Sequence, residues 1–135
     1  MLKKLLYDFE EYFFVFFIGA ALYSFIEVLF RGYTHWTMAL TGGVAFTFLY
    51  AINFIFEKQH LIIKCLAGAL IITLLEFSVG CIVNLKFNMH VWDYSNMRFN
   101  LLGQICPQVT LAWFFLCIPA FSFSNLIKQK AINRR

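Results

Sequence analysis

Two acidic residues, Glu27 and Glu76, lie inside long apolar runs of this 135-residue chain. A carboxylate at membrane depth is costly in free energy, and it usually faces protein or water rather than lipid. Such a group can bind a cation, carry a proton or hold a polar neighbour. We therefore expect the two acids to mark the interior of a helix bundle and its functional site.

Helical spacing groups small and polar residues with each acid, because residues three or four apart share a face. The stripe in the first run consists of Ala20, Ser24, Glu27 and Arg31. The stripe around Glu76 consists of Ala69, Thr73, Glu76, Gly80 and Asn84. A third, in the second run, consists of Gly43, Thr47, Tyr50 and Asn53. Small residues let helices approach closely and polar ones bond between helices, so all three faces are predicted to point inward.

Each acid also has a purely structural interpretation. Arg31 lies four residues after Glu27, so the two can form an ion pair near a helix end without any further role. Glu76 can be a neutral carboxylic acid that is hydrogen-bonded to a neighbouring helix, because desolvation disfavours the charged form. Both interpretations stay open beside the functional one.

The composition is that of an integral membrane protein. Apolar residues make up 61% of the chain and charged residues 13%, far from the soluble balance of roughly half and a quarter. The net charge of +4 is carried at segment ends and in the tail rather than in a patch interleaved with aromatics, which argues against a nucleic-acid partner. Membrane lipids are the expected counterparts of these cations.

The apolar runs predict an all-α fold, a polytopic membrane helix bundle with four transmembrane helices. Each run is near the ~20 residues that a helix needs to cross the hydrocarbon. The predicted spans are 12–30, 37–56, 61–83 and 107–125, within a single domain of residues 1–135. A long loop, 84–106, connects the last two spans and is the natural place for functional residues.

The distribution of basic residues predicts that both termini are cytoplasmic. In that orientation the inner side holds Lys3, Lys4, Lys58, Lys64, Lys128, Lys130, Arg134 and Arg135. The outer side holds only Arg31, Lys86 and Arg98, as the positive-inside rule favours. The ~1.5 Å rise per residue then places Glu27 about 5 Å and Glu76 about 10 Å below the outer ends of their spans. We predict a multi-pass protein of the cell membrane.

Two motifs combine charged, imidazole and indole groups at the outer edge. The first is Glu27-x-x-x-Arg31-Gly32, followed by Thr34-His35-Trp36. The second is Trp92-Asp93-Tyr94-Ser95, followed by Asn100-x-x-Gly103-Gln104-Ile105-Cys106. Over nearly its whole length the chain resembles the putative ABC-transporter type IV permease family, which has these motifs and an intramembrane Glu. The chain departs from its relatives at Arg98, where they tend to have Pro.

The resemblance implies a permease, and a separate ATPase as partner only if that family label holds, since the chain lacks a G-x-x-x-x-G-K-[ST] phosphate-binding loop. Together with the intramembrane acids, the motifs give a candidate ligand-binding set. Its members are Glu27, Arg31, His35, Trp36, Glu76, Trp92, Asp93, Tyr94, Asn100 and Gln104.

Our leading hypothesis is a transport-related subunit with a polar intramembrane pocket for a cation, a proton or a small polar solute. Four spans seldom enclose a pathway alone, so we expect a homo-oligomer or a second membrane subunit. We favour a non-enzymatic role and predict no cofactor. A metal site of Glu27, His35, Glu76 and Asp93 is chemically conceivable, but no spacing requires it, and we predict none.

Two alternatives stay open. The chain could be an intramembrane enzyme acting on a lipid or lipid-linked substrate, with a carboxylate as general base and His35 or His90 assisting. It could also be a non-catalytic membrane subunit or sensor, in which the acids hold the bundle together.

Overall fold

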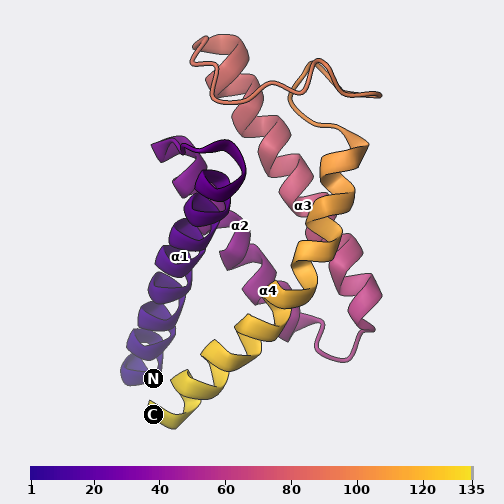
Figure 1. Cartoon of the computed structure of the whole chain (residues 1–135). Coiled ribbons are helices and arrows are strands. Elements are labelled where there is room, and N and C mark those ends of the chain that lie inside the picture. The colour runs from indigo at the N-terminus through magenta and orange to yellow at the C-terminus, as the bar shows by residue number, and fades with distance from the viewer. Residues whose placement is uncertain (135) are drawn as a thin grey trace. The chain divides into compact units, whose positions relative to one another are not determined.

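The computed structural model describes residues 1–134, and most of them are helical (Figure 1). The helices are α1 (Leu2–Arg31), α2 (Trp36–Ile55), α3 (Leu61–Gly80) and α4 (Pro107–Arg134). A π-helical segment, η1 (Cys81–Lys86), continues from the end of α3. The remaining connection before α4 is irregular, apart from one isolated bridge between Leu101 and Ile105.

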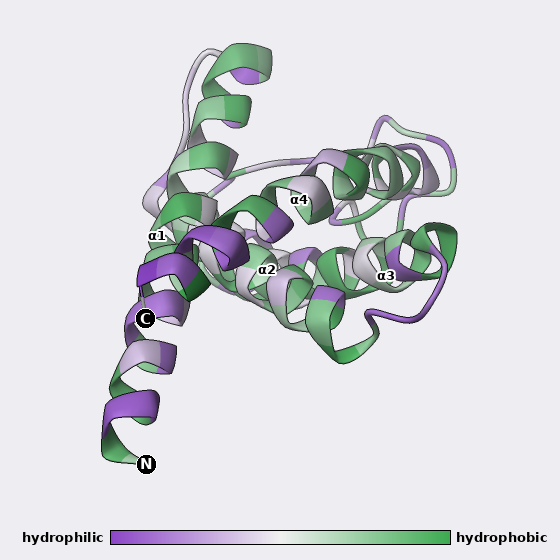
Figure 2. Cartoon of the chain, turned by 90° about the horizontal axis from the view of Figure 1, so that it is seen from below, coloured by the Kyte–Doolittle hydropathy of each residue, from purple (hydrophilic) through white to green (hydrophobic). Residues whose placement is uncertain are grey.

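The predicted all-α membrane fold is confirmed. Each of the four helices is long and apolar enough to cross a bilayer. Hydrophobic residues cover most of each helix, whereas hydrophilic residues gather in the connections and at the first turns of α1 and the last turns of α4 (Figure 2). The side of the membrane on which the termini lie remains a prediction.

The first and last helices, α1 and α4, are longer than the predicted spans. α1 begins at Leu2 rather than near Tyr12, and α4 continues beyond Asn125 to Arg134. The prediction counted only the apolar stretch that the hydrocarbon requires, whereas charged and polar residues such as Lys, Glu and Gln also form helix readily. The charged ends of the chain are therefore helical and can place their side chains on defined faces.

The chain folds into two compact units. Unit 1 contains Met1–Ile55 and the part of α4 that begins at Pro119, and unit 2 contains Phe56–Ile118. One boundary thus falls at Pro119, inside α4, where proline removes a backbone N–H donor from the helix. The single-domain organisation stays a prediction.

In unit 1, α1 and α2 approach each other at two glycines. A Cβ atom on Gly42 would lie 2.3 Å from the Cβ of Tyr23, and one on Gly19 would lie 2.9 Å from the carbonyl oxygen of Gly42. Neither position leaves room for a side chain. The pair therefore permits close backbone packing, as small residues do between membrane helices.

The buried face of α1 differs from the predicted one. Its buried residues are Glu11, Val15, Gly19 and Tyr23. The predicted stripe, from Ala20 to Arg31, is only half-buried. The Gly19–Gly42 approach explains the difference, because it turns the Gly19 side of α1 toward α2, and the buried face therefore includes Glu11 near the charged end.

In unit 2, the predicted stripe of α3 lies on the buried side. Ala69, Glu76, Gly80 and Asn84 are buried, and Thr73 is half-buried. The hydroxyl of Thr73 lies 2.9 Å from that of Thr110 near the start of α4. Pro107 begins α4, as expected for the first turn of a helix. The polar side of α3 is thus covered by α4 and the loop.

Candidate functional site

Glu76 is the most deeply placed acid of unit 2. Its side chain is 3% exposed, and its Oε1 accepts a hydrogen bond of 3.0 Å from the indole Nε1–H of Trp113. Thr73 precedes Glu76 by three residues and therefore lies on the same face of α3, where it contacts Thr110. A carboxylate, an indole N–H and two hydroxyls thus lie close to one another along α3 and α4.

Glu27 forms the ion pair that its spacing from Arg31 allows. The Nη1 of Arg31 lies 3.1 Å from the Oε2 of Glu27, and both side chains are partly exposed. The Nη2 of Arg31 donates to the hydroxyl of Tyr33 at 2.8 Å. α1 ends directly afterwards, because Gly32 adopts a left-handed conformation with φ 82° and donates its N–H to Val28.

The Thr-His-Trp motif forms the beginning of α2. The Nδ1 of His35 lies 2.7 Å from the hydroxyl of Thr37 and accepts a weaker bond of 3.3 Å from its backbone N–H. Trp36 is 63% exposed, with its ring centroid 5.6 Å from that of His35. His35 therefore has a local structural role at the helix start, and Trp36 presents its indole at the surface.

The second motif folds the loop onto the end of α3. Trp92 is 5% exposed, and its Nε1–H donates to the carbonyl oxygen of Gln104 at 3.0 Å. The side chain of Asn84 accepts from the N–H of Val91 at 2.7 Å and donates to the Oε1 of Gln104 at 2.8 Å. Gly80 makes this arrangement possible, since a Cβ there would lie 2.6 Å from that Oε1.

The rest of the motif fixes the outer part of the loop. The N–H of Tyr94 donates to the carbonyl of Gly103 at 2.7 Å, and Asn100 accepts from the N–H of Gly103 at 2.9 Å. Asp93 accepts from the N–H of Ser95 at 2.9 Å, and the hydrogen bonds from Ser95 lower the pKa of this exposed carboxyl. These predicted binding residues therefore bond to the backbone of the loop that carries them.

A second buried carboxylate, Glu11, lies in unit 1, where sequence reasoning did not place a site residue. Glu11 is 6% exposed and accepts hydrogen bonds from the Nζ of Lys128 at 2.8 Å and from the hydroxyl of Tyr50. Tyr50 is fully buried. One turn away on α2, Asn53 donates to Asn125 of α4 at 2.8 Å. Polar contacts thus connect α2 with both α1 and α4.

The sequence contained a signal for this cluster that the span boundaries concealed. The predicted spans, 12–30 and 107–125, leave Glu11 just before the first span and Lys128 just after the last. Glu11, Val15, Gly19 and Tyr23 nevertheless repeat at intervals of four, which is the pattern of a single helix face. Extending α1 to Leu2 would have placed Glu11 on the same side as Gly19.

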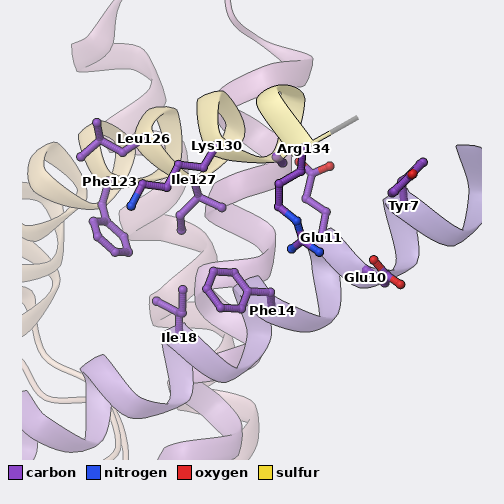
Figure 3. Close-up of a pocket in the computed structure, with 11 residues that line it drawn as sticks. Tyr7, Glu10, Glu11, Phe14, Ile18, Phe123, Leu126, Ile127, Lys130 and Arg134 are labelled. Atoms are coloured by element: carbon purple, nitrogen blue, oxygen red, sulfur yellow. The ribbon is translucent and has the colours of Figure 1, made fainter.

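A cavity of about 270 Å³ lies beside this cluster. Its walls are formed by α1 and the last turns of α4 (Figure 3). No group of three or more His, Cys, Asp or Glu residues suited to a metal ion occurs in residues 1–134.

The fold and its buried carboxylates define an integral membrane protein with four candidate spanning helices. A family model described as putative ABC-transporter type IV matches residues 12–134, and the chain belongs to this family. No solved structure matches the chain. Family membership and the four apolar helices fit a transport-related, multi-pass membrane protein.

Proposed function

We propose that the chain is a transport-related membrane subunit in which Glu76 binds a proton or a small cation during transport. The burial of Glu76 on a spanning helix, beside a neutral indole donor, carries this proposal. Ionisable residues inside membrane segments commonly mark ion pathways and proton relays. The family to which the chain belongs supports the transport role.

The chemistry at Glu76 suits reversible changes of charge. An ionised carboxylate has two oxygens and about four lone-pair sites, so it can accept the Trp113 N–H and bind other groups as well. The indole is neutral, so it orients the carboxylate without cancelling its charge. A proton or a bound cation would cancel the negative charge of the carboxylate. The hydroxyls of Thr73 and Thr110, nearby on the same helices, are hard oxygen ligands for such a cation.

The loop residues have a positioning role in this proposal. Trp92 and Gln104 pack against Gly80, which lies one turn after Glu76 on α3. They cover the adjoining turn of the helix and exclude other groups from it. Asp93, Tyr94 and Asn100 stabilise the loop that carries them. A direct contribution of Glu27, Arg31, His35 and Trp36 to the ligand remains a prediction.

A complex with another membrane subunit, or with further copies of this chain, completes the proposal. Large apolar side chains such as Phe25, Leu74 and Phe115 are more than half exposed and offer surface to lipid or to partner helices. If ATP drives the transport, a separate ATPase subunit supplies it.

The test compares wild-type protein with Glu76→Gln in proteoliposomes that contain a pH-sensitive dye. Gln retains an oxygen that can accept the Trp113 N–H, so the variant is expected to fold and to assemble with unchanged stoichiometry. We expect its proton uptake under an imposed membrane potential, or its thermal stabilisation by Na⁺ or K⁺, to fall at least tenfold. Glu57→Gln, in an exposed connection, is the matched control.

One observation favours a second candidate, a non-catalytic membrane subunit. Every buried side-chain nitrogen and oxygen in residues 1–134 has a hydrogen-bond partner, as expected of a bundle held together by its polar groups. In that case Glu76→Gln would leave the proton and cation responses unchanged, whereas Trp113→Phe would alter stability or stoichiometry.

A further inference from the structure

The cavity of unit 1 has a charged end and an apolar end. Its apolar lining includes Phe14, Ile18, Phe123, Leu126 and Ile127. In Figure 3, Phe14, Ile18 and Phe123 lie at one end of the group, and Glu10, Glu11 and Tyr7 lie toward the other. The polarity of the lining therefore changes along α1, from the N-terminal turns toward the middle of the helix.

Two cations from α4, Lys130 and Arg134, line the same cavity. They are four residues apart and share a helix face. In Figure 3, Arg134 extends toward Glu11 and Lys130 toward Phe123. Both are long, flexible and exposed side chains, so each can turn toward a phosphate at the polar end of the cavity. Within residues 1–134, neither forms an ion pair, whereas Lys128 is paired with Glu11.

The change of polarity along α1 extends over a length that covers the headgroup region of one leaflet and the upper part of its acyl chains. Tyr7 and Ile18 are separated by eleven helical residues, which corresponds to roughly 16 Å along α1. The headgroup and interfacial regions of the two leaflets together add about 10–15 Å to a hydrocarbon core of about 30 Å, that is, about 5–8 Å on each side, so this length also includes the upper part of the acyl chains. Charged residues at one end and apolar residues at the other therefore match an amphipathic molecule whose head lies at the membrane surface.

We propose that this cavity binds one anionic phospholipid, with its phosphate at Lys130 and Arg134 and the upper part of an acyl chain against Phe14, Ile18 and Phe123. Lys and Arg attract phosphate groups, and both walls of the cavity belong to candidate spanning helices that place it within reach of bilayer lipid. The volume of about 270 Å³ holds only part of such a molecule, so the rest of the lipid remains in the bilayer.

Glu10 places a negative charge at the same cavity, and the proposal predicts that this charge weakens lipid binding. It lines the cavity and is exposed, and no ion pair of Glu10 occurs in residues 1–134. Its negative charge therefore opposes a phosphate, whereas the charge of Glu11 is balanced by Lys128. Removal of the Glu10 charge is expected to strengthen lipid binding, and removal of the two cations is expected to weaken it.

The experiment is native mass spectrometry of the full-length protein with phosphatidylglycerol or phosphatidylcholine of the same chain length. For the wild type we expect one lipid to be retained, with phosphatidylglycerol favoured at least fivefold. The double variant Lys130→Gln/Arg134→Gln should lose this preference. Glu10→Gln should increase it by a factor of about two to three.

Lys3→Gln/Lys4→Gln is the matched control, since it removes the same charge from exposed residues of α1 that do not line the cavity. It should retain the preference. Circular dichroism checks that each variant is folded.

Equal retention of the two lipids by the wild type would overturn the proposal. An equal loss of the preference for phosphatidylglycerol in the control and in the Lys130/Arg134 variant would also overturn it. The preference would then come from the overall surface charge rather than from the cavity. Glycerol 3-phosphate distinguishes a soluble anion from a lipid: full competition by millimolar concentrations would show that the acyl chain contributes nothing and would contradict the proposal.

Discussion

Glu11 in unit 1 and Glu76 in unit 2 are both buried carboxylates on membrane-spanning helices, but their hydrogen-bond donors differ in charge. Glu11 accepts from the ammonium group of Lys128 and from Tyr50. Glu76 accepts from the neutral indole of Trp113. The ammonium group balances the charge of Glu11 and favours a fixed ion pair, whereas the indole is a neutral donor that orients Glu76, the acid for which we propose a change of charge. Burial alone therefore does not identify a functional acid.

The largest expected effect comes from breaking the ion pair of unit 1. Lys128→Met leaves the buried carboxylate of Glu11 without its cation and should destabilise the protein by about 3 kcal/mol, the lower end of the range for broken buried pairs. The lower end applies because the Lys128 side chain is 30% exposed. Unfolding in mixed micelles with increasing dodecyl sulfate measures the change.

The double variant Glu11→Gln/Lys128→Met supplies the control. It removes both charges while Gln can still accept the hydrogen bond from Tyr50, so most of the lost stability should return. If the changes in unfolding free energy caused by the two substitutions were instead additive, the Glu11–Lys128 pair would have no coupling energy.

A smaller effect is expected from adding one methyl group at the close contacts of each unit. Gly42→Ala places a Cβ 2.3 Å from the Cβ of Tyr23, which the fixed helix backbones cannot avoid, and should cost about 2 kcal/mol. Gly80→Ala meets side-chain atoms of Gln104 and Trp92, which belong to the loop rather than to a spanning helix, and should cost about 1 kcal/mol. The same unfolding assay ranks them, and the reverse order would contradict the packing described for α1 and α2.

The next prediction concerns the loop that packs on α3. Asn84→Leu removes the acceptor of the Val91 N–H and the donor to Gln104, at a cost of about 1–2 kcal/mol. Hydrogen exchange should quicken across residues 91–104 and remain unchanged in α1 and α2. Asn96→Leu, at an exposed loop position, is the control. If hydrogen exchange across residues 91–104 quickened as much in this variant, Asn84 would have no special role.

The smallest effect is a pH dependence confined to the outer loop. The hydrogen bonds from Ser95 lower the pKa of Asp93 below its usual 3.8, so their contribution is complete above that value and is lost as the pH falls through the lowered pKa. Exchange at Ser95 should therefore quicken only in that acidic range. Asp93→Asn retains an acceptor oxygen and should remove the dependence. Persistence of the same pH profile in the variant would assign it to another group.

The sequence predicted the helices more accurately than the faces that they bury. Continuous apolar runs and the cost of unsatisfied backbone groups in lipid leave helices as the only regular choice, so the all-α fold follows from composition. The buried face of α1 depends instead on its contact with α2. The Gly19–Gly42 approach selects a face one residue away from the polar stripe, and no periodicity of α1 alone could reveal it.

The candidate site was predicted in part. The Glu27–Arg31 pair follows from helical spacing within one helix, and the polar stripe of α3 predicted that Glu76 faces inward, as its burial shows. Trp113 as the donor to Glu76, and Lys128 as the partner of Glu11, come from residues 37 and 117 positions away. Such pairings require the tertiary arrangement within each unit.

The contacts of the motif in the outer loop could not be predicted from the sequence either. Its Trp, Asp, Asn and Gln residues have side chains typical of ligand binding, and the sequence alone could not show that they bond to groups within the same loop. The structure places Trp92 against Gln104 and Asn100 against Gly103. The stabilising role of these residues follows from contacts within the folded loop.

Infrared difference spectroscopy of the protein in native lipids would test whether Glu76, rather than Glu11, changes its charge. The carboxyl C=O band of a protonated acid should appear and disappear as the pH is stepped, persist in Glu11→Gln, and vanish in Glu76→Gln. A band that persists in Glu76→Gln and vanishes in Glu11→Gln, or no pH-dependent band at all, would contradict the assignment of the exchangeable site to Glu76.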